Sequence, residues 1–208
     1  MRPDAEQLGA QVEAHLLASA EVKRRVAETC MDSILTAARL ITDAFRSGGK
    51  VLLCGNGGSA ADCQHMAAEF VNRFTKDLER PGLPAVALTT DTSFLTAFAN
   101  DVGFEGVFER QVQTLGKPGD VLIGVSTSGN SKNVVRAVEQ ALRMRMRVVT
   151  LTGDQGRLPK LADAAICVPA DNVQYIQEAH LAIEHILCSL VERHLYGTAN
   201  TSDSERTP

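Results

Sequence analysis

A histidine and a glutamate lie one helical turn apart in the segment CGNGGSAADCQHMAAEF, at His65 and Glu69. The sequence from 59 to 74 is expected to be helical, and side chains four residues apart then share one face of the helix. Such a pair could hold a divalent metal, as His and Glu do around zinc, or could supply a base for proton transfer. An exposed His–Glu pair without a chemical role has the same spacing, so the pair alone does not decide between them.

A second expected helix, residues 172–196, carries several polar residues among aliphatic ones. Residues separated by four, seven or eight positions on a helix share a face, so more than one combination of these side chains could act together. The combinations are Gln177 with His185, His180 with Glu184, and Glu178 with His185. Periodicity does not choose among them, and either histidine could instead be a surface or core residue with local hydrogen bonds.

A run of small polar residues, Ser126 to Ser131, interrupts the stretch LIGVSTSGNSKNVV at 122–135. The apolar run before it predicts a buried strand, and a helix should begin near Asn130 or Ser131. The first N–H groups of a helix lack partners within it and its dipole end is positive, while small residues let an anion approach the backbone. The pattern indicates a phosphate-binding loop, although a polar connection with a Ser or Asn cap is the simpler alternative. It is neither a Walker loop nor a dinucleotide-binding GxGxxG.

The loop CGNGGSAAD has the same layout after the expected strand 50–55, with Asn56, Gly57, Gly58 and Ser59 forming the turn and the cap. Two such loops in one sheet strengthen the prediction of a ligand site. In a parallel sheet, ligands bind outside the carboxyl ends of the strands.

Apolar strands alternate with helices along most of the chain, which predicts a parallel sheet covered on both faces. The expected strands are 50–55, 84–90, 120–126, 147–153 and 164–170. Before them, residues 4–47 have a helical pattern that we expect to break near Ser19–Glu21 and to end at the glycines of RSGGK. This order of elements predicts an α/β fold preceded by N-terminal helices.

The composition is that of an ordinary enzyme-sized domain: 208 residues, 44% hydrophobic and 22% charged, with a net charge of −4. That charge argues against a nucleic-acid partner, despite the basic run RMRMR at 143–147. Five scattered cysteines without a CxxC argue for reduced thiols in the cytoplasm, not for disulfides or a thiolate zinc cluster. No signal peptide and no membrane-spanning run is visible, so we expect a cytoplasmic protein without a membrane partner.

Several segments taken together resemble the phosphoheptose isomerases, which belong to the sugar isomerase (SIS) family. The resemblance extends over roughly residues 20–196 and rests on CGNGGSAADCQHMAAEF, FANDVGFEGVF, GDVLIGVSTSGNSKNV, VVTLTG and IQEAHLAIEHIL. It implies a three-layer α-β-α sandwich of the flavodoxin-like SIS type, with a mainly parallel five-stranded sheet. The implied organisation is N-terminal helices over 1–48, an SIS domain over 49–196 and a disordered tail over 197–208. The resemblance also implies a homotetramer with active sites at the subunit interfaces.

The resemblance further implies conversion of sedoheptulose 7-phosphate to D-glycero-D-manno-heptose 7-phosphate, the first step of nucleotide-activated heptose synthesis. Glu69 and His185 would be the acid/base pair, and His65, Glu69, Gln177 and His185 would bind one zinc ion per subunit. The phosphate would be held by Ser126, Thr127, Ser128 and Ser131. The rest of the substrate would meet Asn56, Gly57, Gly58, Ser59, Glu69, Asn100, Asp101 and Gln177.

These roles suit an isomerisation through a cis-enediol, in which one base moves a proton from C1 to C2 and another group moves protons between the two oxygens. Glu69 would do the first and His185 the second. A zinc-bound carboxylate is a weaker base, which sets the two roles of Glu69 against each other. Two alternatives share the fold and the STSGNS-type loop: a non-catalytic tetrameric adaptor, resembling the bacterial replication-initiator-associating protein, and another sugar-phosphate isomerase or sensor.

Overall fold

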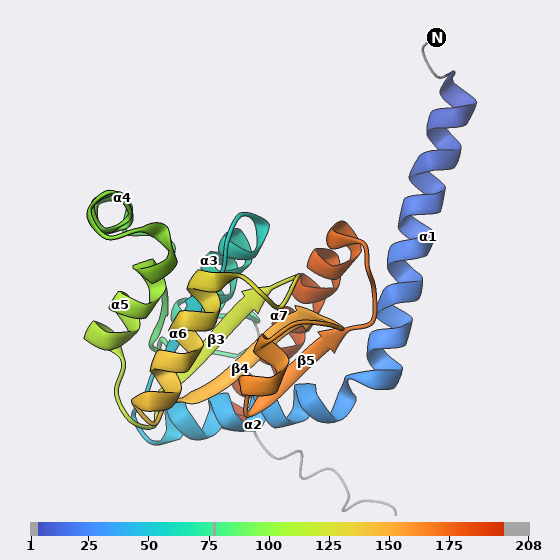
Figure 1. The fold of residues 1–208 in the computed structure, drawn as a ribbon. Coiled ribbons are helices and arrows are strands. Elements are labelled where there is room, and N and C mark those ends of the chain that lie inside the picture. Colours follow the sequence, from blue (N-terminus) through green and yellow to red (C-terminus); the bar gives the residue numbers. More distant parts are fainter. Residues whose placement is uncertain (1–3, 77, 198–208) are drawn as a thin grey trace, which may run out of the picture.

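The computed structural model describes residues 4–76 and 78–197, which fold around one parallel sheet (Figure 1). The strands are β1 (Val51–Cys54), β2 (Ala85–Ala87), β3 (Val121–Ser126), β4 (Arg147–Gly153) and β5 (Ala164–Val168). All neighbouring pairs are parallel, in the order β2-β1-β3-β4-β5. The structure confirms the predicted five-stranded α/β sandwich. Of the tail expected over 197–208, residues 198–208 lie outside the described residues.

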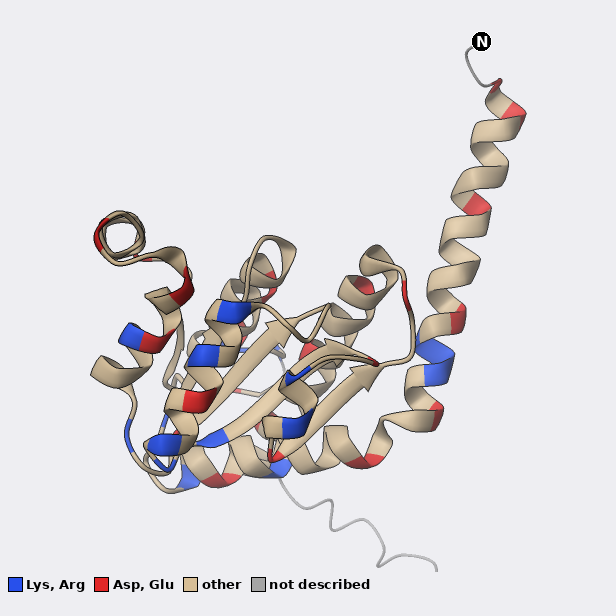
Figure 2. Cartoon of the chain, in the orientation of Figure 1, with Lys and Arg blue, Asp and Glu red and all other residues tan. Residues whose placement is uncertain are grey.

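Helices cover both faces of the sheet, because its strands are apolar on both faces. One face packs against α2 (Met31–Arg46), α3 (Gly58–Val71) and α7 (Val173–Tyr196). The other packs against α5 (Val107–Leu115), α6 (Lys132–Arg143) and the outlying α4 (Thr92–Asp101), with the short 3-10 turns η1 (Phe104–Gly106) and η2 (Leu158–Leu161). Figure 2 shows that charge lies on the outer faces of the helices and is sparse on the strands.

Alternate residues of each strand enter opposite cores. In β1, Leu53 packs toward α2, α3 and α7, while Leu52 packs toward α5 and α6. Both leucines are fully buried, and each such side chain stabilises the fold by about 1.5–3 kcal/mol. The near-continuous apolar runs in the sequence therefore reflect burial on two sides.

The N-terminal helices break at Cys30, between α1 (Ala5–Thr29) and α2, so the break predicted near Ser19–Glu21 is wrong. No glycine or proline marks this position. The Cys30 side chain is buried and its thiol donates to the carbonyl of Cys167 in β5, at 3.2 Å. The bend is thus placed by docking of Cys30 on the sheet: α2 runs along the sheet while α1 projects away from it (Figure 1).

The two polar loops seen in the sequence lie at the switch point of the sheet. β1 and β3 are adjacent, yet α3 leaves β1 toward one face and α6 leaves β3 toward the other. A crevice forms at the carboxyl ends of the strands wherever successive helices diverge in this way, and ligands bind there in open α/β sheets. The fold therefore brings both loops to one edge.

Candidate active site

Two imidazoles that are 120 residues apart in the chain meet on α3 and α7. The Nε2 atoms of His65 and His185 are 3.1 Å apart, and His65 Nε2 lies 3.5 Å from Glu69 Oε1. His65 is the middle member of this cluster and is partly exposed, as is Glu69. The ring of Phe74 packs beside His185, with the ring centroids 5.9 Å apart. The cluster presents imidazole and carboxylate groups to solvent, where a substrate can reach them.

Gln177 lies at the other end of α3, against its first turn. A Cβ added at Gly58 would lie 2.6 Å from Gln177 Nε2, so only glycine leaves room for this amide. Gly57 precedes it with a φ of 57°, a left-handed conformation that glycine adopts readily. Because Gln177 faces the start of α3 and His185 faces its middle, α7 runs beside α3 in the same direction.

The donor types of this cluster suit zinc. Zn–N and Zn–O bonds of 2.0–2.2 Å put the ligand atoms of a tetrahedral site about 3.3 Å apart, close to the two distances measured around His65. The 3.1 Å between the two Nε2 atoms equally fits a hydrogen bond in which one neutral imidazole donates to the other. Among the described residues, no group of three His, Cys, Asp or Glu side chains has the arrangement of a metal site. Both contacts measured in the cluster involve His65, one with His185 and one with Glu69.

The other polar residues of α7 lie in the core or contact α1. His180 is fully buried, its Nε2 lies 3.2 Å from the Thr152 carbonyl, and burial lowers its pKa to about 4. Glu184 is also buried, and burial, followed by the Asp62 charge, raises its pKa to about 9. Glu178 pairs with His15 and accepts a hydrogen bond from Ser19. Glu184 lies near Asp62 of α3 but inside the core. Only in the combination of Gln177 with His185 do both side chains lie against α3, at Gly58 and at His65.

Three hydroxyls of the loop after β3 converge at the start of α6. Ser126 Oγ lies 2.9 Å from Ser131 Oγ and 3.3 Å from Ser128 Oγ. Ser131 is the N-cap of α6, but its side chain makes no capping hydrogen bond. The hydroxyls and the first N–H groups of the helix are therefore placed to receive an anion.

A cavity of about 330 Å³ opens beside this loop, between the ends of β3, β4 and β5 and the start of α7. Its lining residues are Thr127, Ser128, Asn130, Gly153, Asp154, Gln155, Ala170, Asp171, Val173 and Ile176. The volume is at the lower end for small-molecule sites, which span roughly 300–1,000 Å³. It is open enough for the phosphate end of a small metabolite.

The loop after β4 holds the serine loop in place. The Gly129 carbonyl accepts from the N–H groups of Arg157 and Leu158, at 2.9 and 3.0 Å. Gly129 has a φ of 63° and packs directly on Gly156. Asn130 adds a hydrogen bond from the Arg157 N–H to its side-chain oxygen, at 3.0 Å. These contacts give a loop of small residues one conformation.

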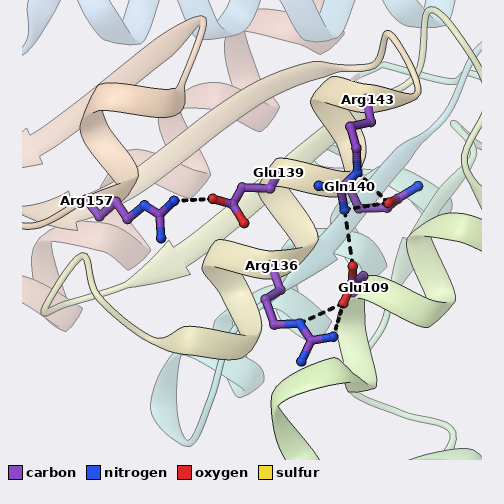
Figure 3. A network of polar contacts seen from close by, with 6 residues as sticks. All are labelled: Glu109, Arg136, Glu139, Gln140, Arg143 and Arg157. Atoms are coloured by element: carbon purple, nitrogen blue, oxygen red, sulfur yellow. Dashed lines mark hydrogen bonds and ion pairs between the residues drawn. The ribbon is translucent and has the colours of Figure 1, made fainter.

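Ion pairs brace α6, which carries the serine loop, on both sides (Figure 3). Arg157 pairs with Glu139 of α6. Arg136 and Arg143, also on α6, both reach Glu109 of α5, with Arg136 Nε 2.7 Å from the carboxylate. Exposed pairs contribute little singly, so their role here is to fix the orientation of α6.

Asn56 and Asn133 connect the two loops. Their side-chain amides exchange two hydrogen bonds, and Asn133 is 4% exposed. The sequence analysis did not single out Asn133. Its signal is an amide at an otherwise apolar, inward-facing position in the first turn of α6.

The remaining candidates are spread more widely. Ser59 is buried in the first turn of α3. Asn100 and Asp101 are exposed at the end of α4 and hydrogen-bond to each other at 2.8 Å. In the described residues α4 packs on η1 and α5, not on α3 or α7. A single chain therefore does not bring Asn100 and Asp101 to the histidine cluster.

The SIS domain model matches residues 15–153, and the chain belongs to the SIS domain family. Within this family it is similar to phosphoheptose isomerases. It is 53% identical over 180 residues to that of a Roseiflexus species, covering 86% of this chain and 90% of the relative. It is 47% identical to that of Helicobacter pylori, covering 88% and 95%.

The fold is also similar to that of solved phosphoheptose isomerase structures. The phosphoheptose isomerase of Neisseria gonorrhoeae superposes with a TM-score of 0.83 at 43% identity, covering 88% of this chain and 98% of the other. That of Francisella tularensis gives a TM-score of 0.84 at 37% identity, covering 88% and 97%. No helix in the described part of the chain is long and apolar enough to cross a membrane.

Proposed function

We propose that the chain isomerises sedoheptulose 7-phosphate to D-glycero-D-manno-heptose 7-phosphate, as the first step of nucleotide-activated heptose synthesis. The observation that carries this is the meeting of His65, Glu69 and His185 on α3 and α7, two helices that begin at the sheet edge where the serine loop lies. An enzyme that isomerises a sugar phosphate needs a binding site for the phosphate and proton-transfer groups near the carbonyl carbon. The similarity to phosphoheptose isomerases supports the substrate.

The phosphate end binds at the start of α6. The hydroxyls of Ser126, Thr127, Ser128 and Ser131 donate to the phosphate oxygens, together with N–H groups of the first helical turn. The positive end of the helix dipole adds to the attraction. Asn56 and the first turn of α3 contact the sugar chain, because they adjoin α6 through the amide pair of Asn56 and Asn133.

Proton transfer takes place at the other end of the substrate. Glu69 removes the proton from C1 and returns it at C2 through a cis-enediol, while His185 moves protons between the two oxygens. Glu69 lies on the solvent-facing side of α3 with a partly exposed carboxylate, accessible to a bound sugar. Because both steps involve adjacent atoms, one carboxylate and one imidazole suffice.

Zinc fits the donors of His65, Glu69 and His185. Together with Gln177, whose amide lies nearer the first turn of α3, they would hold one ion per subunit. When bound, it would polarise the substrate oxygens and stabilise the charge that develops on them. A Glu69 carboxylate with one oxygen on the metal keeps the other for the substrate, which reconciles its two roles.

The active form is a homotetramer with sites shared between subunits, in the cytoplasm. The helix α1 supports assembly, because it leaves large apolar side chains uncovered: Leu8, Val12, Leu16 and Leu17 are 48–63% exposed. Asn100 and Asp101, which do not reach the cluster within one chain, would reach the site of a neighbour. Five cysteines without disulfides suit a reducing compartment.

The deciding experiment is an assay of the purified protein with sedoheptulose 7-phosphate beside other ketose phosphates. We expect turnover of the heptulose phosphate at the highest kcat/KM. Preferred turnover of another ketose phosphate would make the chain a different isomerase. Absence of turnover with all of them, in a folded tetramer with zinc added, would favour the adaptor or sensor.

A further inference from the structure

A fully buried ion pair lies next to the histidine cluster but belongs to none of the roles assigned so far. Arg80 comes from the segment between α3 and β2, and Glu192 comes from the last turns of α7. Arg80 Nε is 3.3 Å from Glu192 Oε1, and the two side chains are 1% and 2% exposed. Charged side chains are almost never buried so completely unless paired, since desolvation is costly.

Arg80 caps the end of α3 at the turn that carries Glu69. Its guanidinium donates to the carbonyls of Glu69 and Phe70, both at 2.9 Å. The last carbonyls of a helix lack partners within it, and a cation there also complements the helix dipole. Arg80 therefore holds the backbone of Glu69 itself.

Glu192 contacts the chain just beyond the same end of α3. Its second oxygen accepts a hydrogen bond from the backbone N–H of Phe74, just beyond α3, at 3.1 Å. α3 and α7 otherwise share apolar contacts, among them Phe70 with the buried face of α7. Apolar contacts are non-directional. The hydrogen bonds from Arg80 to the end of α3 and from the Phe74 N–H to Glu192 are directional, and the attraction between the two buried charges joins them.

We propose that Arg80 and Glu192 are positioning residues that set α3 against α7 and so aim Glu69 toward His65 and His185. This rests on the proposed function, in which Glu69 moves the proton. Misplacement of a catalytic group by about 1 Å can lower a rate roughly 100-fold. The proposed phosphate-binding loop, at the start of α6, does not contact this part of α3 and α7. Loss of the pair should thus lower kcat and leave KM nearly unchanged.

The test is the double variant Arg80→Met with Glu192→Gln, assayed as the full-length protein. A buried ion pair replaced as a whole by neutral groups often keeps stability, and the amide introduced by Glu192→Gln still has an oxygen for the Phe74 N–H. The variant should stay folded with a lower melting temperature, because methionine leaves the carbonyls of Glu69 and Phe70 without their donor. We expect a kcat lowered roughly 10- to 100-fold and a KM within about twofold. Wild-type kcat in the folded double variant would overturn the proposal, as would a change in KM alone.

Two further variants separate positioning from general stability. Arg80→Lys keeps the charge but loses the planar fork that reaches two carbonyls, so kcat should fall even if the double variant fails to fold. Val112→Ala, in the core under α5, should lower the melting temperature without changing kcat. If Arg80→Lys retains full kcat, the proposal is wrong. A wild-type protein that turns over no ketose phosphate contradicts the proposed function instead.

Discussion

The side-chain amides of Asn56 and Asn133 exchange two hydrogen bonds, of 2.9 and 2.8 Å, between the loop after β1 and the first turn of α6. The two residues lie on strand–helix units that diverge to opposite faces of the sheet. Their pairing links the start of α6, which follows the serine loop, to the loop that leads into α3, the helix that bears His65 and Glu69. Each amide uses both its donor and its acceptor in this pair.

Asn133→Ala should lower the free energy of unfolding by about 1–3 kcal/mol, because it leaves the polar atoms of Asn56 without their partner. It should also raise KM, since Asn56 contacts the sugar in the proposed site. Urea unfolding and steady-state kinetics measure both effects. Asn100→Ala, at an exposed position, should change stability by less than about 0.5 kcal/mol. Equal effects of the two substitutions on stability would contradict the role given to the amide pair.

Glu69→Gln should lower kcat at least about 100-fold, because it removes the base while keeping the shape of the side chain. The variant should remain folded and assembled, as circular dichroism and size-exclusion chromatography can show. Glu28→Gln, an exposed carboxylate near the end of α1, is the matched control and should retain nearly full kcat. Wild-type turnover by the Glu69 variant would rule out the mechanism.

Ser131→Ala should raise KM by roughly 10- to 100-fold with little change in kcat, because a hydrogen bond to a charged group contributes about 1.5–3 kcal/mol and the phosphate is remote from the reacting carbons. The inhibition constant of inorganic phosphate should rise in parallel. Thr114→Ala, which removes an exposed hydroxyl on α5, should leave both constants unchanged. An unaltered phosphate inhibition constant in the Ser131 variant would show that the phosphate binds elsewhere.

Elemental analysis should find one zinc ion per subunit in the wild-type protein and none after His65→Ala, which removes the middle donor of the cluster. His194→Ala, at an exposed position near the end of α7, should keep its metal. If the wild-type protein binds no zinc even after zinc is added, the set of proposed ligands is wrong.

His180 should make stability fall as the pH is lowered from 6.5 to 4. Its pKa is near 4 in the folded chain, owing to burial, and 6.5 in the reference state. In that window the unfolded chain binds a proton that the folded chain does not, so the free energy of unfolding drops, by a total on the order of 3 kcal/mol. His180→Gln should show a smaller difference between urea unfolding at about pH 7 and at about pH 4.5. An unchanged difference would contradict this assignment, and His194→Gln provides the comparison.

The sequence by itself determined the elements of this protein and the chemistry of its loops. Apolar runs ended by small polar residues mark the strands and their ligand-bearing ends, and the helical spacing of His65 and Glu69 places both on one face. These features depend on residues within about one helical turn of each other, so they can be recognised locally.

Only the tertiary structure decided which faces meet. The break at Cys30 follows from its docking on β5. The rotation of α7 against α3 brings His185 to His65 and turns His180 into the core. The Asn56–Asn133 and Arg80–Glu192 pairs likewise join residues that are far apart in the chain. Such contacts depend on the packing of whole elements around a shared core, and the spacing of residues within one element does not specify it.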